Sequence, residues 1–258
     1  MMMYDLLKNY KNYLLQSYSQ ETANTYYKRL CILFEGQSLT NTASNLDFEK
    51  ILDSLKQIKY KNYFSQSKNA LLHFCKFQGV FLCSDILKSI KEIENGTRKK
   101  YRKFALVDFK EVDSAIKHIK NKKLKISYQT IIATGLRVSE VAQIRPRDCI
   151  VTSNTITFGF VGKGGANETV MMIKSENPTL FQSITEHMKS TGADKKLFYS
   201  AVYLQRQAKN LGFACHDLRR AYAKLEYKKC GSKDEVKEKM RHSNAKNTSI
   251  YLESKVKL

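Results

Sequence analysis

The sequence predicts a mainly α-helical protein of two domains, on three observations. Apolar residues recur at helical spacing through residues 4–93 and again through most of the C-terminal part. One stretch, residues 151–173, is instead rich in β-branched and aromatic residues around a glycine turn. A basic segment separates the two helical parts. We therefore expect an N-terminal helical bundle over residues 1–96, a linker over 97–105, and a mixed, mostly helical domain with a small antiparallel β-sheet over 106–258.

Five helices are expected in the N-terminal domain. Ser19 is a typical helix N-cap, and Glu21 follows in the first turn, where a carboxylate favours the helix dipole. Gly36 and Gly79 are typical helix ends. The apolar stripes are more simply explained as core than as ligand pockets. They run over Leu6–Leu14, Ala23–Phe34, Leu46–Leu55, Tyr63–Phe77 and Ile86–Ile93.

The C-terminal domain is expected to combine helices with one hairpin. Asp108 and Glu111 resemble a capping box that opens a helix through about Ile119. A helix from about Ser127 is broken by Gly135. A short helix follows from Glu140 and is stopped by Pro146. The hairpin strands lie near 155–160 and 168–173, and the later helices near 177–189, 201–210, 217–229, 233–240 and 244–252.

Charge is the strongest signal in the composition. The chain has a formal net charge of +21 over 258 residues. Residues 1–97 hold 12 Lys and Arg against 9 Asp and Glu, whereas residues 98–258 hold 33 against 15. Such a surface indicates a polyanionic partner, and nucleic acid explains it better than a merely solvated basic face.

Other partners and compartments have little support. No apolar run reaches transmembrane length, and the start of the chain lacks a signal-peptide pattern. The six cysteines are scattered without a C-x-x-C pair, which argues against structural zinc and favours reduced thiols in the cytoplasm.

The predicted linker is basic enough to contact a phosphate backbone. Five cations occupy six consecutive positions there, and a solvated linker is the simpler alternative. The change in composition and the jump in charge coincide at this point, which favours DNA contact. The five residues are Arg98, Lys99, Lys100, Arg102 and Lys103.

Six side chains in the C-terminal domain suit transfer of a DNA phosphodiester to a tyrosine. Guanidinium groups match the charge that develops on the non-bridging oxygens, a nucleophile must attack in line, and the leaving 5′ oxygen needs a proton. A tyrosine nucleophile conserves the bond energy, so the strand can be rejoined without ATP or metal. The six are Arg137, Lys163, His216, Arg219, His242 and Tyr251.

In this order and spacing, the chain resembles the tyrosine recombinase (phage integrase) family over about residues 100–258. Each motif alone is weak, but the ordered set is specific. The N-terminal helices look like the family's SAM-like core-binding domain. The matching motifs are Thr134-Gly135-Leu136-Arg137-Val138-Ser139-Glu140, Gly162-Lys163-Gly164, His216-Asp217-Leu218-Arg219, and His242-Ser243 followed by Tyr251.

The resemblance implies roles for the cationic residues. Arg137 and Arg219 would clamp the scissile phosphate. Lys163, at the hairpin tip, would protonate the 5′-oxygen leaving group. Glu140 would support the Arg137 region without taking part in the chemistry.

The resemblance also implies the remaining roles. His216 would act as general acid and base, His242 would hydrogen-bond a non-bridging oxygen, and Tyr251 would form a 3′-phosphotyrosyl link. The reaction would need no cofactor or metal. The partner would be double-stranded DNA at specific recombination sites, bound by a homo-tetramer in the cytoplasm, or in a host nucleoid if a mobile element encodes the protein.

Two departures from the family pattern stand out. The family usually has Leu-Gly before the second histidine, where this chain has Met240-Arg241. The arginine adds charge and replaces a glycine that normally eases a tight turn. The hairpin continues with Gly165-Ala166-Asn167, where relatives often place further cations.

Three alternatives remain open at this point. The same chemistry would serve a type IB topoisomerase-like enzyme that relaxes supercoils, or a hairpin-forming resolvase. A catalytically inactive, sequence-specific DNA-binding protein would explain the net positive charge but not the catalytic residue types. The complete set of catalytic residue types favours the recombinase.

Overall fold

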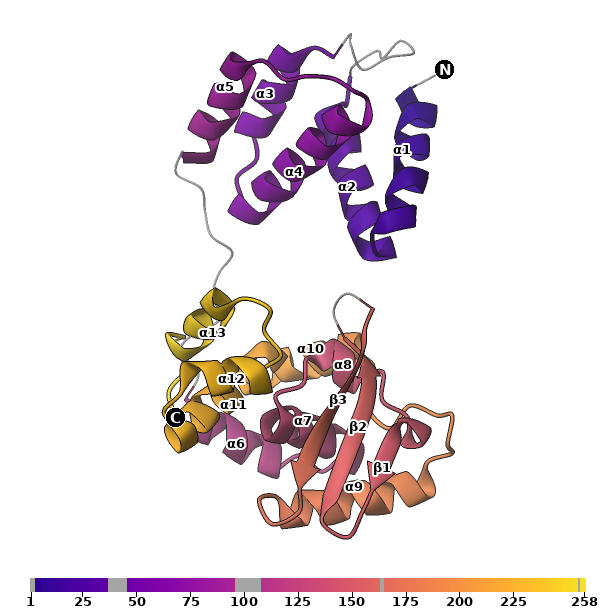
Figure 1. The fold of residues 1–258 in the computed structure, drawn as a ribbon, viewed down its shortest axis with the longest axis vertical. Coiled ribbons are helices and arrows are strands. Elements are labelled where there is room, and N and C mark those ends of the chain that lie inside the picture. Colours follow the sequence, from indigo (N-terminus) through magenta and orange to yellow (C-terminus); the bar gives the residue numbers. More distant parts are fainter. Residues whose placement is uncertain (1–2, 37–45, 96–107, 163–164, 255) are drawn as a thin grey trace. The chain divides into compact units, whose positions relative to one another are not determined.

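The computed structural model describes residues 3–36, 46–95, 108–162, 165–254 and 256–258. The chain divides into two compact units, Met1–Lys103 and Phe104–Leu258 (Figure 1). The five cations of the predicted linker lie outside the described residues, and so does Lys163. The predicted mainly α-helical fold class with one small antiparallel sheet is confirmed.

The N-terminal unit is a bundle of helices. Helix α2 packs against both α1 and α4, and α3 packs against α5. Ser19 accepts a hydrogen bond from the Thr22 N–H, as expected of an N-cap. The core is formed by fully buried residues such as Tyr10, Leu30 and Phe74. The helices are α1 (Met3–Ser17), α2 (Gln20–Leu33), α3 (Phe48–Lys56), α4 (Lys61–Phe77) and α5 (Ser84–Asn95).

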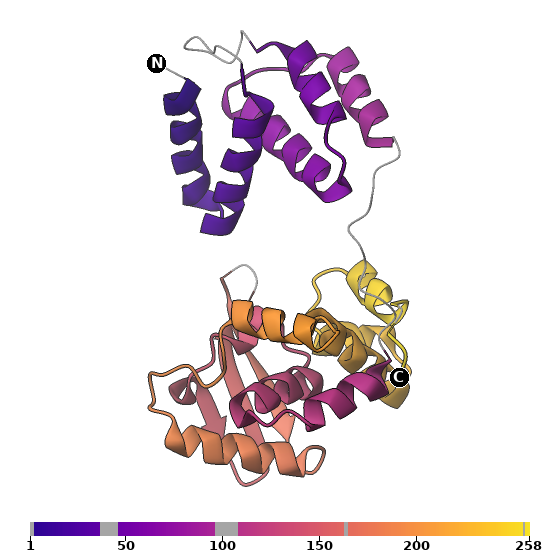
Figure 2. The same cartoon turned by 180° about the vertical axis from the view of Figure 1, so that it is seen from behind.

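The C-terminal unit is built around helix α7 and a three-stranded sheet. Helix α7 packs against α11, α9 and strand β3. Helices α7 and α9 lie behind the sheet in Figure 1 and in front of it in Figure 2. The helices are α6 (Phe109–Lys117), α7 (Lys122–Thr134), α8 (Val138–Val141), α9 (Pro178–Ser190), α10 (Ala201–Asn210), α11 (Cys215–Cys230), α12 (Lys233–Lys239) and α13 (Ala245–Leu252).

The sheet is antiparallel in the order β1–β2–β3, with strands β1 (Cys149–Val151), β2 (Thr155–Val161) and β3 (Asn167–Ile173). Alternate residues of β2 enter the core, and Ile156, Phe158 and Phe160 are buried there. The register pairs Val161 with Asn167 at the hairpin end.

Three boundaries differ from the sequence prediction. Helix α7 begins at Lys122, not near Ser127, because the Asn121 side chain caps it by accepting from the Leu124 N–H at 2.9 Å. Pro146 opens the short 3₁₀ turn η2 (Pro146–Asp148), and strand β1 follows it directly. A strand of three residues is too short to show an alternating pattern, so the sequence did not predict it.

Within the described ranges, none of the helices combines the length and apolar character needed to cross a membrane. The same ranges contain no group of three His, Cys, Asp or Glu side chains that could hold a metal ion.

Candidate active site

The turn between α7 and α8 aims Arg137 into the site. Gly135 ends α7 with a left-handed φ of 63°. A Cβ atom at Gly135 would lie 2.5 Å from Tyr222 Cε1 on α11, closer than any side chain tolerates. Glycine is therefore required there for two reasons, its positive φ and its contact with α11. The turn is so tight that Arg137, only two residues after Gly135, already lies at the start of α8.

Glu140 holds Arg137 in place. Its carboxylate accepts from the Arg137 backbone N–H at 2.7 Å and from the Arg137 guanidinium at 2.5 Å. The Glu140 side chain is only 2% exposed. Burial alone would raise the pKa of this carboxyl, but the Arg137 hydrogen bonds and the nearby charge of Arg241 lower it below its ordinary value. Glu140 is therefore an ionised support for a guanidinium that still reaches the surface.

Arg219 is the most buried cation of the site, with a side chain 1% exposed. Its guanidinium donates to the Gly135 carbonyl and, at 2.5 Å, to the Met240 carbonyl, so it links α11 to two turns. Its Nε is buried and has no hydrogen-bond partner among the described residues. Burial and the neighbouring Arg137 lower the pKa of Arg219 to about 10. A buried, incompletely bonded guanidinium beside a second one is suited to an anion.

Tyr251, on α13, lies between two imidazoles. Its phenol oxygen is 2.5 Å from His216 Nε2. The Tyr251 ring centroid is 5.0 Å from that of His216 and 4.9 Å from that of His242. The Arg219 guanidinium carbon is 6.0 Å from the same centroid. A phenol, two imidazoles and a guanidinium therefore meet at one point.

Both imidazoles favour the neutral form. Desolvation, with the charges of Arg220 and Arg219, lowers the pKa of His216 to about 4. Desolvation and the charges of Arg219 and Arg137 do the same for His242, also to about 4. His216 is partly open to water, which screens these charges. The downward shift of its pKa nevertheless leaves a neutral ring at pH 7. A neutral His216 can accept the phenol proton of Tyr251 through Nε2.

Thr248 orients His242 from the helix that carries the tyrosine. Its hydroxyl lies 3.0 Å from His242 Nδ1, and both residues are buried. Thr248 is not among the site residues predicted from the sequence. Its position three residues before Tyr251, on one helical face, was the available signal.

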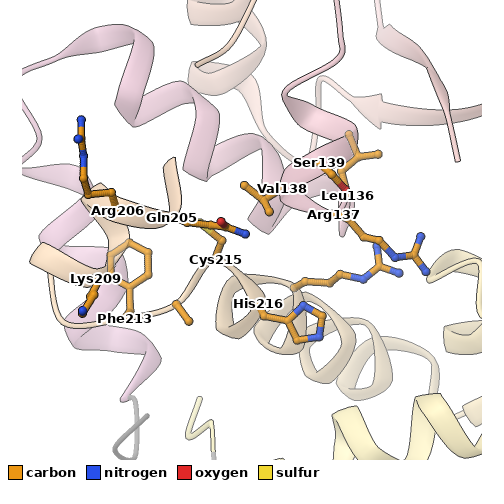
Figure 3. A pocket seen from close by; sticks show the side chains of 12 residues that line it. Leu136, Arg137, Val138, Ser139, Gln205, Arg206, Lys209, Phe213, Cys215 and His216 are labelled. Atoms are coloured by element: carbon orange, nitrogen blue, oxygen red, sulfur yellow. The ribbon is translucent and has the colours of Figure 1, made fainter. Parts of the chain in front are cut away.

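A cavity of about 600 Å³ opens beside these groups (Figure 3). Arg137 and His216 line one part of it, and Arg206, Lys209 and Phe213 line the opposite end. Gln205, Arg206 and Lys209 of α10 were not singled out by the sequence, because an isolated polar helix face looks the same whether or not it borders a cavity.

Comparisons with known proteins identify the family of the chain and structures that share its fold. The model of the Phage integrase family matches residues 105–257, which is more than half of the chain. The chain belongs to the phage integrase family. A search of curated protein sequences finds no significant match.

Solved structures of other recombinases share the fold of this phage integrase family member. XerH site-specific recombinase bound to its difH substrate is 18% identical, with a TM-score of 0.62, over 89% of this chain and 74% of XerH. A lambda integrase dimer bound to a COC′ core site is 12% identical, with a TM-score of 0.71, over 98% and 96%. A lambda integrase tetramer bound to a Holliday junction is 13% identical, with a TM-score of 0.64, over 95% and 78%.

Six of the seven candidate site residues that the sequence selected in the C-terminal unit of this integrase family member lie together. They come from four separate parts of the chain, namely the start of α8, the start of α11, the turn before α13, and α13 itself. The six are Arg137, Glu140, His216, Arg219, His242 and Tyr251.

Proposed function

We propose that this protein is a site-specific DNA recombinase that cleaves and rejoins strands through a 3′-phosphotyrosyl intermediate, without metal or ATP. Membership of the phage integrase family supports integrase-like recombination. The observation that carries the proposal is the contact of 2.5 Å between the Tyr251 phenol and His216 Nε2, beside the buried Arg219.

The proposed cleavage step begins with proton transfer from the Tyr251 phenol to the neutral His216 imidazole. The phenolate then attacks the scissile phosphorus in line, and the bond to the 5′ oxygen breaks. A proton restores that oxygen to a hydroxyl, and we assign its delivery to Lys163. In rejoining, a 5′ hydroxyl attacks the phosphotyrosyl link and both proton transfers run in reverse. The number of phosphodiester bonds is therefore unchanged over the whole reaction.

The charge developing on the non-bridging oxygens would be met by Arg137 and Arg219. Both are permanently charged, and the unpaired Nε of Arg219 is a donor available for an oxygen. His242 would supply a further contact from Nε2, since Thr248 occupies Nδ1. Glu140 would keep Arg137 aligned while remaining outside the reaction.

DNA is the partner that this chemistry requires. XerH and lambda integrase are described bound to DNA sites, and lambda integrase as a tetramer on a Holliday junction. We propose that this chain likewise acts on specific double-stranded sites as a homo-tetramer. The N-terminal unit would serve as a core-binding domain, and the cations of residues 98–103 would contact the backbone between the domains. The protein would act where the DNA lies, in the cytoplasm or nucleoid.

A nicked suicide duplex tests the enzymatic proposal. A binding site is first selected from random duplexes, and a nick placed beside the scissile phosphate then traps the covalent intermediate. We expect a covalent protein–DNA band with the wild type and none with Tyr251→Phe. Tyr227→Phe is the matched control, since Tyr227 is exposed on α11 and lies outside the site. No band with the wild type, or an unchanged band with Tyr251→Phe, refutes the proposal.

A second assay separates recombination from simple relaxation. Two labelled duplexes carrying the selected site are incubated with the wild type, together with a supercoiled plasmid carrying one site. We expect strands joined between the two duplexes. Relaxation without joining would instead support the topoisomerase-like alternative.

A further inference from the structure

The turn before His242 has an unusual backbone for the residue it contains. Arg241 has a φ of 53°, and among the described residues it is the only non-glycine with a positive φ. Left-handed backbone is unfavourable for an arginine, and such strain is retained where the surrounding structure requires it. A glycine would adopt this turn without strain. The contacts of the arginine side chain are what a glycine at this position would lack.

The Arg241 guanidinium lies between two carboxylates. Its Nη2 donates to Glu140 Oε2 at 3.1 Å. Its Nε is 3.1 Å from Glu168 Oε2, close enough for an ion pair although the atoms are not aligned for a hydrogen bond. The side chain is 15% exposed and lies over the Phe160 ring, 5.1 Å from its centroid. Arg241 thus joins α8, β2 and β3 to the turn that precedes His242.

Glu168 connects this contact to the hairpin end. It stands opposite Phe160 in the β2–β3 register. Its carboxylate lies against Gly162, where an added Cβ would collide with it. Gly162 is the residue directly before Lys163 in the chain. The position of Arg241 therefore affects, through Glu168, the position of the backbone at the end of β2.

Glu140 provides the second connection. Its Oε2 already accepts from Arg137 and Arg241, and Arg219 Nη1 is 4.0 Å away from it. Without Arg241, this buried carboxylate would be less neutralised and would attract Arg219 more strongly. A shift of Arg219 toward Glu140 would change its position relative to Tyr251.

We infer that Arg241 is a positioning residue for the reaction, linking the carboxylate that orients Arg137 to the glutamate beside the turn of the β2–β3 hairpin. The inference rests on the proposed function. Arg241 itself contacts neither the phenol nor the two imidazoles in the contacts described for these residues. It acts by fixing Glu140 and Glu168, so that the Arg137 segment and the end of β2 keep one relative position.

The test compares Arg241→Gly and Arg241→Lys with the wild type. Glycine removes the guanidinium and also relieves the backbone, so loss of the fold is not expected to obscure the result. Lys117→Ala is the matched control for loss of one positive charge, because the Lys117 side chain is exposed on α6 and forms its ion pair with Asp113, away from the candidate site. Single-turnover formation of the covalent complex is measured at saturating duplex, together with the duplex Kd and the melting temperature.

We expect Arg241→Gly to cleave about 10- to 100-fold more slowly at saturating duplex, the range of effects that misplacement of reacting groups produces. The Kd is expected to change less than about 3-fold, because the guanidinium is largely buried and one charge of many is lost. Arg241→Lys should recover part of the rate, since it keeps the charge but cannot reach both carboxylates.

A double-mutant cycle with Glu168→Gln measures the coupling between the two side chains. Such coupling in the cleavage rate is not expected if Arg241 only stabilises the fold. If the two side chains act as a unit, Glu168→Gln alone also slows cleavage, and the double variant cleaves at nearly the rate of Arg241→Gly alone. The inference is overturned if Arg241→Gly cleaves within about 2-fold of the wild type, or if the two defects are additive. Failure of the wild type to cleave would refute the proposed function, which is a distinct result.

Discussion

Positive charge is concentrated around the Tyr251 phenol. Arg219 is buried against it, and Arg137 lies close enough to influence the pKa values of both Arg219 and His242. Desolvation first, and then this positive field, lower the pKa of His216 and of His242, so both imidazoles favour the neutral form. At the scale of single residues, the two imidazoles therefore favour the neutral form, which the proposed proton transfer from the phenol requires.

The two imidazoles are expected to titrate near pH 4, well below the ordinary histidine value of 6.5. Since the folded pKa values are depressed, the unfolded chain binds more protons between pH 6.5 and 4, and the free energy of unfolding falls as pH decreases through that window. Histidine NMR titration of the free protein, assigned with single-histidine variants, measures the midpoints. A midpoint at or above 6.5 for His216 would contradict this description of the site.

Gly135 is expected to tolerate substitution less well than another glycine of similar backbone. Gly231, with φ of 69°, has no atom within 4 Å of an added Cβ, whereas Gly135, with φ of 63°, meets Tyr222. Gly231→Ala should lose about 1–2 kcal/mol of unfolding free energy from the backbone alone. Gly135→Ala should lose a further 1–3 kcal/mol, approximately, from overpacking. Urea denaturation measures both, and equal losses would show that the Tyr222 contact is unimportant.

At the scale of elements, helix α11 holds α13, the helix that carries Tyr251, through two separate sets of contacts. Its first turn carries His216 and Arg219, which contact Tyr251. Farther along, Lys224 donates to the Ser254 carbonyl at 2.6 Å and to the Val256 carbonyl at 2.7 Å. The Phe109 N–H donates to the Lys257 carbonyl at 2.8 Å. The segment after α13 is therefore held on the same unit that contains the site.

Replacing Lys224 by methionine should loosen α13. The two charge-assisted hydrogen bonds would be lost, at a cost of about 1–3 kcal/mol. Amide hydrogen exchange over residues 245–254 should accelerate, and cleavage should slow. Lys228→Met is the matched control, since Lys228 is exposed on the same helix. Unchanged exchange in Lys224→Met would indicate that the segment is held by other contacts.

Most elements of the fold could be predicted from the sequence because their causes are local. Amphipathic periodicity and glycine ends located the long helices. Strand β1 was missed because three residues carry no period, and the start of α7 was missed because the cap at Asn121 precedes the apolar stripe.

The site could be predicted only in part. The ordered motifs identified Arg137, His216, Arg219, His242 and Tyr251, since residue type and spacing persist in the sequence. The ties that Thr248 and Arg241 make depend on which side chains meet in the folded chain. Such contacts carry no local signature. The sequence signalled Arg241 only as a departure, without indicating its partners.

At the scale of the whole molecule, the uneven charge is the dominant feature. The formal net charge is +21, and most of it lies after residue 97. If duplex DNA is the partner, affinity should fall steeply with salt as condensed counterions are released. Six to ten phosphate contacts would reduce affinity about 10³- to 10⁵-fold between 50 and 200 mM salt. Fluorescence anisotropy over that range measures the slope, and a flat response would contradict DNA binding through this charge.

The central claim is that Tyr251 becomes linked to DNA. The most direct measurement is mass spectrometry of the covalent complex trapped on the nicked suicide duplex, after digestion of both protein and DNA. The proposed function predicts one nucleotide-bearing peptide, with a 3′-phosphate joined to the Tyr251 oxygen and a free 5′-hydroxyl on the released strand. A nucleotide joined to any other residue, or joined through its 5′ end, would contradict it.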